Sequence, residues 1–396
     1  MNLTGSFSLI AALSLSIFGH PVPAYAQADG GTGAALSPAA FDYQPQDDDE
    51  RGLWMQMDEL EREVKNSQSL IKDPELNAYI RKILCSAVGE SCGRVRIYIM
   101  RTPYFNASMA PNGMMIVWSG LLLRTKNEAE LASVLGHEFS HFDRLHSLQS
   151  FRNIRQKTDA MAWMSFVPYV GFIGQIGAIR SIFSFSRDME RQADLVSLDY
   201  LADAGYDPRA ASDIWRRLRA EMDATAEERK RKSQKDNNGG FFASHPNSGE
   251  RMEYLEQAAA QKPPKNYVRN EAEYRAALAR WWPLLIDDQI KLNDFGATEF
   301  LLRQLGESGW TPQLLYARAE LYRARGKEGD FTQAAAFYRQ SLAADAELAE
   351  SWRGLGLALI RSGAPEEGKT ALHRYLRANP DAFDRGIIEM MAGAGK

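Results

Sequence analysis

Apolar and polar positions recur with two different periods along this chain, and together they predict a mainly helical protein with a small β-sheet. Residues 94–100 (RVRIYIM) alternate charged and apolar side chains, as a half-buried strand does, and residues 114–118 predict a second strand after a Pro-Asn-Gly turn. Helical spacing of apolar residues extends over 52–66, 74–88 and 127–155. The expected fold class is therefore mainly α with a small β-sheet (α+β).

The C-terminal part of the chain repeats itself. Residues 330–345 match residues 364–379 at an offset of 34 residues. Helix pairs of this length resemble tetratricopeptide repeats, which stack into a curved array that binds peptide segments; an unrelated helical bundle is the alternative. We expect a first domain over 51–265 and a repeat domain over 266–396.

The N-terminus has the features of an export signal. Residues 1–26 carry no charged side chain, and an apolar run is followed by Ala24-Tyr25-Ala26, a small-x-small cleavage pattern. We expect a signal peptide cut after Ala26, with a membrane-anchoring helix as the alternative. Residues 27–50 are rich in Gly, Ala, Pro and Asp and predict a flexible leader.

Residues 160–179 form a second stretch without a charge. Its length would cross a bilayer, but Pro168 and several glycines interrupt it. A buried hairpin that covers an active site and a segment in peripheral contact with a membrane both remain open.

Composition excludes several classes of protein. The chain has 396 residues, of which 45% are hydrophobic and 25% are charged, as is ordinary for a globular protein. Lys plus Arg number 47 against 51 Asp plus Glu, so the net charge is −4 and no basic field indicates nucleic-acid binding. The two cysteines, Cys85 and Cys92, predict one disulfide in an exported chain, with two buried thiols as the alternative.

The sequence His137-Glu138-Phe139-Ser140-His141 carries the candidate chemistry. Histidines four residues apart project from one face of a helix, where two imidazole nitrogens can bind one zinc ion. Glu138 follows the first ligand and can reach a water molecule instead of the metal. A pair of helix histidines without a metal is the alternative interpretation.

A third ligand is expected downstream. The metzincin position is occupied by Ser147, and His146 misses it by one residue. Residues 187–200 are helical in pattern and place Glu190 and Asp194 four residues apart. Glu190 can complete a His2Glu site with an open fourth position, and Asp194 can accept the free N–H of either imidazole. An ordinary solvated acid is the alternative for Glu190.

Five short motifs follow one another along the chain: HEFSH at 137–141, ERQAD at 190–194, AGYDP at 204–208, SHP at 244–246 and ERM at 250–252. In this order they resemble one zinc-peptidase family, which includes HtpX, the CAAX-processing proteases and the periplasmic protease BepA. The resemblance covers about residues 52–256, and the segment NASMAPNG at 106–113 is similar to the strand that precedes the zinc helix in that family.

The resemblance implies a gluzincin-type endopeptidase domain with one zinc ion per chain and Glu138 as its general base. Its zinc ligands would be His137, His141 and Glu190, with Asp194 and Arg251 around them. His245 is similar to a histidine on a mobile loop of the family, which either stabilises the transition state or occupies the open zinc position. A loop histidine without metal contact and a solvent-exposed Arg251 are the alternatives.

The resemblance also implies a location and partners. With its export signal and repeats, the chain is most similar to BepA-like members, so we expect a periplasmic enzyme of outer-membrane protein assembly and quality control. Its partners would be polypeptide substrates, paired with the strand near 111–118 that includes Asn112 and Gly113, and assembly machinery bound by the repeats. A latent or inactive repeat-bearing adaptor and a membrane-anchored protease are the rival interpretations.

Overall fold

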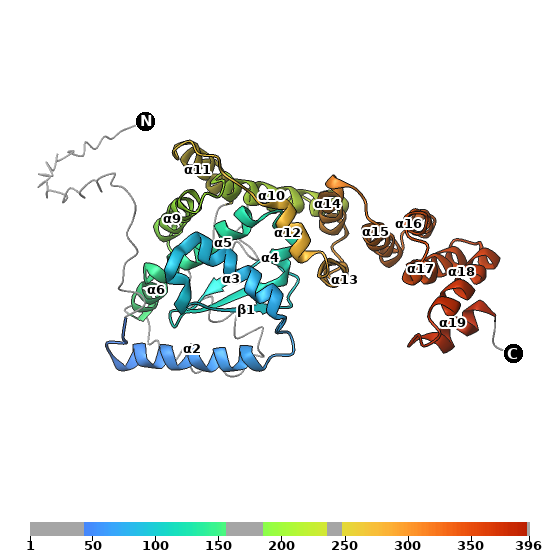
Figure 1. Cartoon of the computed structure of the whole chain (residues 1–396), viewed down its shortest axis with the longest axis horizontal. Coiled ribbons are helices and arrows are strands. Elements are labelled where there is room, and N and C mark those ends of the chain that lie inside the picture. Colours follow the sequence, from blue (N-terminus) through green and yellow to red (C-terminus); the bar gives the residue numbers. More distant parts are fainter. Residues whose placement is uncertain (1–42, 156–184, 236–247, 394–396) are drawn as a thin grey trace, which may run out of the picture. The chain divides into compact units, whose positions relative to one another are not determined.

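The computed structural model describes residues 43–155, 185–235 and 248–393. In these ranges the chain is mainly helical with one three-stranded sheet, which confirms the expected α+β class (Figure 1). The first part contains α2 (Asp48–Asn66), α3 (Pro74–Val88), η1 (Gly89–Arg94), β1 (Arg96–Met100), β2 (Ala107–Met109), β3 (Met114–Trp118), α4 (Ser119–Arg124), α5 (Glu128–Asp143), α6 (His146–Arg155), α9 (Arg187–Asp203), α10 (Ala210–Glu228) and α11 (Ser248–Ala260). The C-terminal part contains α12 (Glu271–Leu278), α13 (Trp282–Ile290), α14 (Phe295–Leu305), η4 (Gly306–Ser308), α15 (Pro312–Arg325), α16 (Asp330–Ala344), α17 (Ala349–Arg361), α18 (Pro365–Ala378) and α19 (Arg385–Ala392).

Strand β3 lies in the middle of the sheet. The strand order is β1-β3-β2, with β1 parallel and β2 antiparallel to β3. Ile116 is therefore opposite Tyr98 on one side and Ser108 on the other. The expectation that substrate pairs with residues 111–118 is wrong, because both edges of this strand are already hydrogen bonded.

Asn112 and Gly113 lie in the turn between β2 and β3. The Asn112 side-chain oxygen accepts a hydrogen bond from the Met114 N–H at 3.1 Å, and its amide donates to Asp58 of α2 at 2.9 Å. Gly113 has a φ of 88°, a left-handed conformation that glycine adopts without a steric penalty. These two residues thus close a tight turn against α2.

Helices cover both faces of the sheet. Alternate residues of a strand point to opposite faces, so the fully apolar sequence of β3 contributes to two cores. Met114 and Ile116 pack with Leu53 and Met57 of α2, whereas Met115 and Val117 belong to the larger core that includes α3 and α5. Figure 1 shows α2 along one side of the sheet and α3 and α5 on the other.

The helix expected over 127–155 is divided into α5 and α6. Asn127 caps α5 by accepting a hydrogen bond from the Glu130 N–H at 2.9 Å. Leu145 has a φ of 54°, and this left-handed residue ends α5 without a glycine or proline to signal it. As a result His146 begins α6, and its ring lies against the ring of His141.

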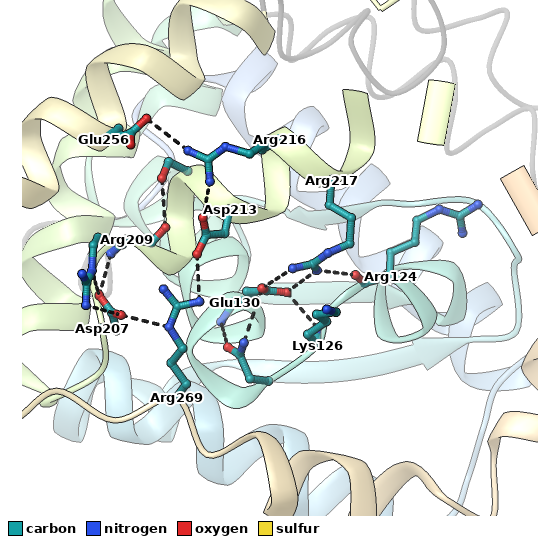
Figure 2. Close-up of polar contacts among 12 residues, drawn as sticks. Arg124, Lys126, Glu130, Asp207, Arg209, Asp213, Arg216, Arg217, Glu256 and Arg269 are labelled. Atoms are coloured by element: carbon teal, nitrogen blue, oxygen red, sulfur yellow. Dashed lines mark hydrogen bonds and ion pairs between the residues drawn. The ribbon is translucent and has the colours of Figure 1, made fainter. Parts of the chain in front are cut away.

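An ion-pair network holds the first turn of α5 against α10 (Figure 2). The buried Glu130 carboxylate accepts two hydrogen bonds from Arg217, each 2.6 Å long. Nearby, Arg269 bridges Asp207 at 2.9 Å and Asp213 at 2.8 Å. Because the bidentate Arg217 pair is largely removed from solvent, it fixes the start of α5 more firmly than an exposed pair would.

Two pairs of helices form the repeats. Helices α15 with α16 and α17 with α18 correspond to the repeat detected in the sequence. Gly354 of α17 faces the ring of Tyr338 so closely that a Cβ atom there would overlap it. The absence of a side chain at Gly354 therefore allows α17 to pack closely against α16.

Of the remaining expectations, some are tested by the structure and others lie outside the described residues. Cys85 and Cys92 are joined, which confirms the predicted disulfide. Helix α2 begins at Asp48, so the last residues of the expected leader are helical. The signal at 1–26, the stretch 160–179 and His245 lie outside the described residues. None of the helices described is long and apolar enough to cross a bilayer.

Candidate metal centre

Helices α5 and α9 pack together and bring three potential metal ligands to one point. A nitrogen from each of His137 and His141 and a carboxylate oxygen of Glu190 lie within 4.8 Å of one another. The three residues are 6%, 1% and 3% exposed. Two imidazoles and one carboxylate that converge in a buried position have the arrangement of a metal site.

The separations between the donor atoms fit a tetrahedral zinc ion. Bonds of about 2.0–2.1 Å at tetrahedral angles place ligand atoms about 3.3 Å apart. The two Nε2 atoms of His137 and His141 are 3.1 Å apart, and Glu190 oxygens lie 3.6 and 3.5 Å from them respectively. Two imidazoles and one carboxylate are also a donor set typical of zinc sites with an open position.

Asp194 lies one turn after Glu190 and orients His137. Its Oδ1 is 2.8 Å from Nδ1 of His137, so the Nε2 of that ring faces the other two donors. Burial alone would raise the pKa of Asp194, but the charges of Arg251 and His137 outweigh it and hold that pKa well below its usual range. Asp194 is therefore ionised at neutral pH and fixes the ring, as carboxylates commonly do beside zinc-bound histidines.

Arg251 of α11 pairs with the two buried acids from the other side. It is 3% exposed and donates from Nε to Asp194 at 2.8 Å, while its Nη1 lies 3.3 Å from Glu190. Its guanidinium stacks over Trp215 with 4.1 Å to the ring centroid, and the Tyr254 hydroxyl also donates to Asp194. One buried cation thus offsets part of the negative charge of Asp194 and of the candidate ligand Glu190.

Glu138 borders a small cavity. The cavity has a volume of about 20 Å³ and is also lined by His137, Phe105 and Trp215. A space of about this size holds a single water molecule. The buried Glu138 carboxylate is therefore adjacent to a position for one water, next to a candidate ligand.

The predicted residues divide into three groups. His137, His141, Glu190, Glu138, Asp194 and Arg251 are brought together, with Asp194 against His137 and Arg251 buried instead of solvent-exposed. Asn112 and Gly113 lie elsewhere, in the turn against α2. His245 falls outside the described residues.

Sequence reasoning missed two polar residues at the site. His146 is 3.0 Å from His141, and Gln192 is 2.9 Å from His146. His146 had been considered only as a metal ligand, and the break at Leu145 that places it here has no clear signal in the sequence. Gln192 lies within the ERQAD motif at 190–194, but only Glu190 and Asp194 of that motif were given roles.

Comparisons with known proteins agree with this geometry. Residues 70–259 match Peptidase family M48, and residues 326–385 match Tetratricopeptide repeat. The chain is 31% identical over 162 residues to mitochondrial metalloendopeptidase OMA1 of Arabidopsis thaliana, covering 41% of this chain and 31% of the relative. It is 29% identical over 208 residues to the Schizosaccharomyces pombe OMA1, covering 52% and 57%.

A bacterial relative is matched at similar length. The chain is 26% identical over 232 residues to the beta-barrel assembly-enhancing protease of Escherichia coli, covering 53% of this chain and 45% of that protein. The chain thus spans 31%, 57% and 45% of the length of these three relatives. It carries a metallopeptidase domain of family M48, followed by tetratricopeptide repeats.

Proposed function

We propose that the chain is a zinc-dependent endopeptidase that hydrolyses peptide bonds in unfolded or misassembled exported proteins. The observation that carries this proposal is the buried cluster of His137, His141 and Glu190, with its donor atoms spaced for zinc. Glu138 beside a water-sized cavity supplies the second requirement of peptide hydrolysis, which is a base next to the nucleophile.

Different residues would bind the metal, transfer the proton and hold the ligands in place. Zinc bound to the three ligands would polarise the peptide carbonyl and make water more acidic. Glu138 accepts the proton of the attacking water and transfers it to the departing amine. Asp194 and Arg251 keep His137 and Glu190 in place throughout, since both are buried and hydrogen bonded to each other.

The free edge of β2 is suited to an extended substrate. Asn106 and Ala110 both bond to β3, so the alternate residues Ala107 and Met109 direct their backbone groups to the opposite edge. No described strand pairs with that edge. Because β2 packs on α5, a peptide added there would pass the metal site. Backbone hydrogen bonds of this kind do not depend on the side chains of the substrate, but they require an extended segment. This favours unfolded substrates.

A larger cleft lies close to the start of β2, at Tyr104 and Phe105. It has a volume of about 1000 Å³, and Phe105, which also lines the small cavity at Glu138, forms part of its wall together with Trp118 and Leu218. A cleft that shares a wall residue with the cavity at Glu138 can take side chains of a bound segment. This supports cleavage within a chain over removal of single terminal residues.

Replacement of Glu138 tests the enzymatic proposal. We expect Glu138→Gln to lower cleavage of an unfolded protein such as reduced, carboxymethylated lysozyme by at least about 100-fold, because the general base is lost. Zinc content should stay unchanged, since Glu138 is not a ligand. The control is Glu253→Gln, an exposed residue of α11, which should cleave normally. Equal cleavage by Glu138→Gln and the wild type would reject the proposed mechanism.

The cellular role is a further part of the proposal. A periplasmic location and action in outer-membrane protein assembly are supported by the export-type N-terminus and by similarity to the beta-barrel assembly-enhancing protease. The repeats would hold partner segments of the assembly machinery. Intact-mass measurement of the exported protein should give a chain that begins at Gln27; an uncut N-terminus would support the membrane-anchored alternative.

A further inference from the structure

His146 is a buried polar residue that has no role in the proposed hydrolysis. It is 2% exposed and begins α6 directly after the left-handed Leu145. Its Nδ1 is 3.0 Å from Nδ1 of His141, and its Nε2 is 2.9 Å from the side-chain oxygen of Gln192. The three side chains form a line from α9 to the candidate ligand.

We propose that His146, oriented by Gln192, is a positioning residue that keeps the proton of His141 on Nδ1 and leaves Nε2 free to bind the metal ion. This inference rests on the proposed zinc site. It concerns residues that take no part in coordination.

The assignment follows from the donors and acceptors along the line. A neutral imidazole has one N–H and one lone pair. The Gln192 oxygen can only accept, so it takes the Nε2–H of His146 and leaves Nδ1 of His146 as an acceptor. His141 must then donate from its own Nδ1, which places the lone pair of Nε2 toward His137 and Glu190.

His146 lies on the wrong side of His141 to be a fourth ligand. It contacts Nδ1, whereas the atom that faces the other donors is Nε2. The three-residue cluster within 4.8 Å does not include it. Its effect on the metal therefore passes through the ring of His141.

The ring of His141 is also held in its plane. Phe185 stacks on it with centroids 3.8 Å apart and an angle of 15° between the planes. Stacking fixes the plane but does not distinguish the two nitrogens. The hydrogen bond to His146 supplies that distinction for His141, as Asp194 does for His137.

The sharpest test compares two replacements of His146. In His146→Asn the side-chain oxygen can take the place of the accepting Nδ1, whereas His146→Leu has no acceptor. We expect His146→Leu to bind zinc about 10–100-fold more weakly in a chelator competition, as is typical when the partner of a metal-bound histidine is lost. His146→Asn should remain within a few-fold of the wild type. Asn153→Ala, an exposed site on α6, is the control.

A second readout does not depend on zinc or on catalysis. In the metal-free protein, nitrogen-15 chemical shifts of the imidazoles report which nitrogen carries the proton. We expect His141 to be protonated on Nδ1 in the wild type and in His146→Asn, and to shift toward Nε2 protonation in His146→Leu. Gln192→Leu should shift it in the same direction, and it serves as the test if His146→Leu does not fold.

The outcomes separate this inference from the proposed function. A wild type that binds no zinc would reject the zinc enzyme, while the tautomer measurement would still decide the role of His146. Zinc affinity and tautomer that are the same in His146→Leu and the wild type would overturn the inference. It would equally be overturned if His146→Asn were as weak as His146→Leu, because the acceptor would then be irrelevant.

Discussion

Among single side chains, Arg251 is a buried cation that contacts two buried carboxylates at the candidate metal site. Arg251 is paired with Asp194 and lies beside Glu190, and all three are almost completely removed from solvent. Burial alone would lower the pKa of Arg251, but the two carboxylates outweigh it and raise that pKa. Without this cation, two carboxylates would face one another in a medium of low polarity, where repulsion is strong.

Loss of Arg251 should therefore destabilise the fold. We expect Arg251→Leu to lower the free energy of unfolding by about 3–5 kcal/mol, because it leaves a buried carboxylate without its partner. Urea unfolding of the metal-free protein measures this change. Arg191→Leu, whose exposed side chain only covers the ring of Tyr254, should cost about 1 kcal/mol or less. Similar losses in the two variants would contradict the role given to Arg251.

Among the secondary-structure elements, α2 is tied to the sheet by one acid. The Glu61 carboxylate accepts hydrogen bonds from Arg96 at 2.6 and 2.7 Å and from the Tyr98 hydroxyl at 2.7 Å. Burial alone would raise the pKa of Glu61, but these bonds and the charges of Arg96 and Lys65 lower it from 4.5 to about 2. Helix α2 is thus held to β1 by polar contacts as well as by its apolar face.

This arrangement predicts a dependence of stability on pH. A carboxyl group with a lowered pKa stabilises the fold fully above its unfolded pKa of 4.5 and loses this contribution as pH falls toward 2. The free energy of unfolding of the wild type should therefore exceed that of Glu61→Gln above pH 5, with the difference shrinking between pH 4.5 and 2. Unfolding curves recorded across this range measure it. A difference that stays constant with pH would show that Glu61 acts only through packing.

Two of the three strands could be predicted from the sequence, and the third could not. β1 and β3 have alternating or continuous apolar residues, and both were expected within two residues of their ends. β2 was missed, because Ala107–Met109 is only three residues long and has no strong strand preference. Strand order is a long-range property, so the substrate edge was assigned to β3 although β2 holds the free edge.

The site was easier to predict than its surroundings. Helical spacing relates His137 to His141 and Glu190 to Asp194 directly, and this local geometry requires no knowledge of the fold. His146 reaches His141 only because the chain reverses at Leu145, a left-handed residue without a glycine. Local sequence patterns do not predict contacts that depend on such a break.

In the molecule as a whole, the repeats have apolar cores of their own. One cluster gathers residues of α15 to α18, and another gathers residues of α17 to α19. The buried apolar residues of α16, α17 and α18 thus pack among repeat helices, as expected when stability arises from stacking, whereas Leu314, Ala317 and Leu321 of α15 belong to the larger core. Changes within these clusters should leave the metal site intact.

Two matched glycine replacements test this separation. Gly354→Ala should lower the unfolding temperature of the repeats, because its Cβ overlaps Tyr338 and overpacking costs about 1–3 kcal/mol. Gly386→Ala on α19 meets no atom within 4 Å and should be neutral or slightly stabilising, as alanine favours helix. Calorimetry measures both, and zinc content should be unchanged. A rise in unfolding temperature for Gly354→Ala would contradict the close packing of α16 and α17.

The zinc content of the purified chain tests the His2Glu zinc site most directly. We expect about one zinc per chain in the wild type and in Asp188→Ala, an exposed acid on the same helix as Glu190. Glu190→Ala should lose the metal while it remains folded by circular dichroism. A folded wild type that holds no zinc after zinc is supplied, or a Glu190→Ala variant that retains it fully, would contradict the account.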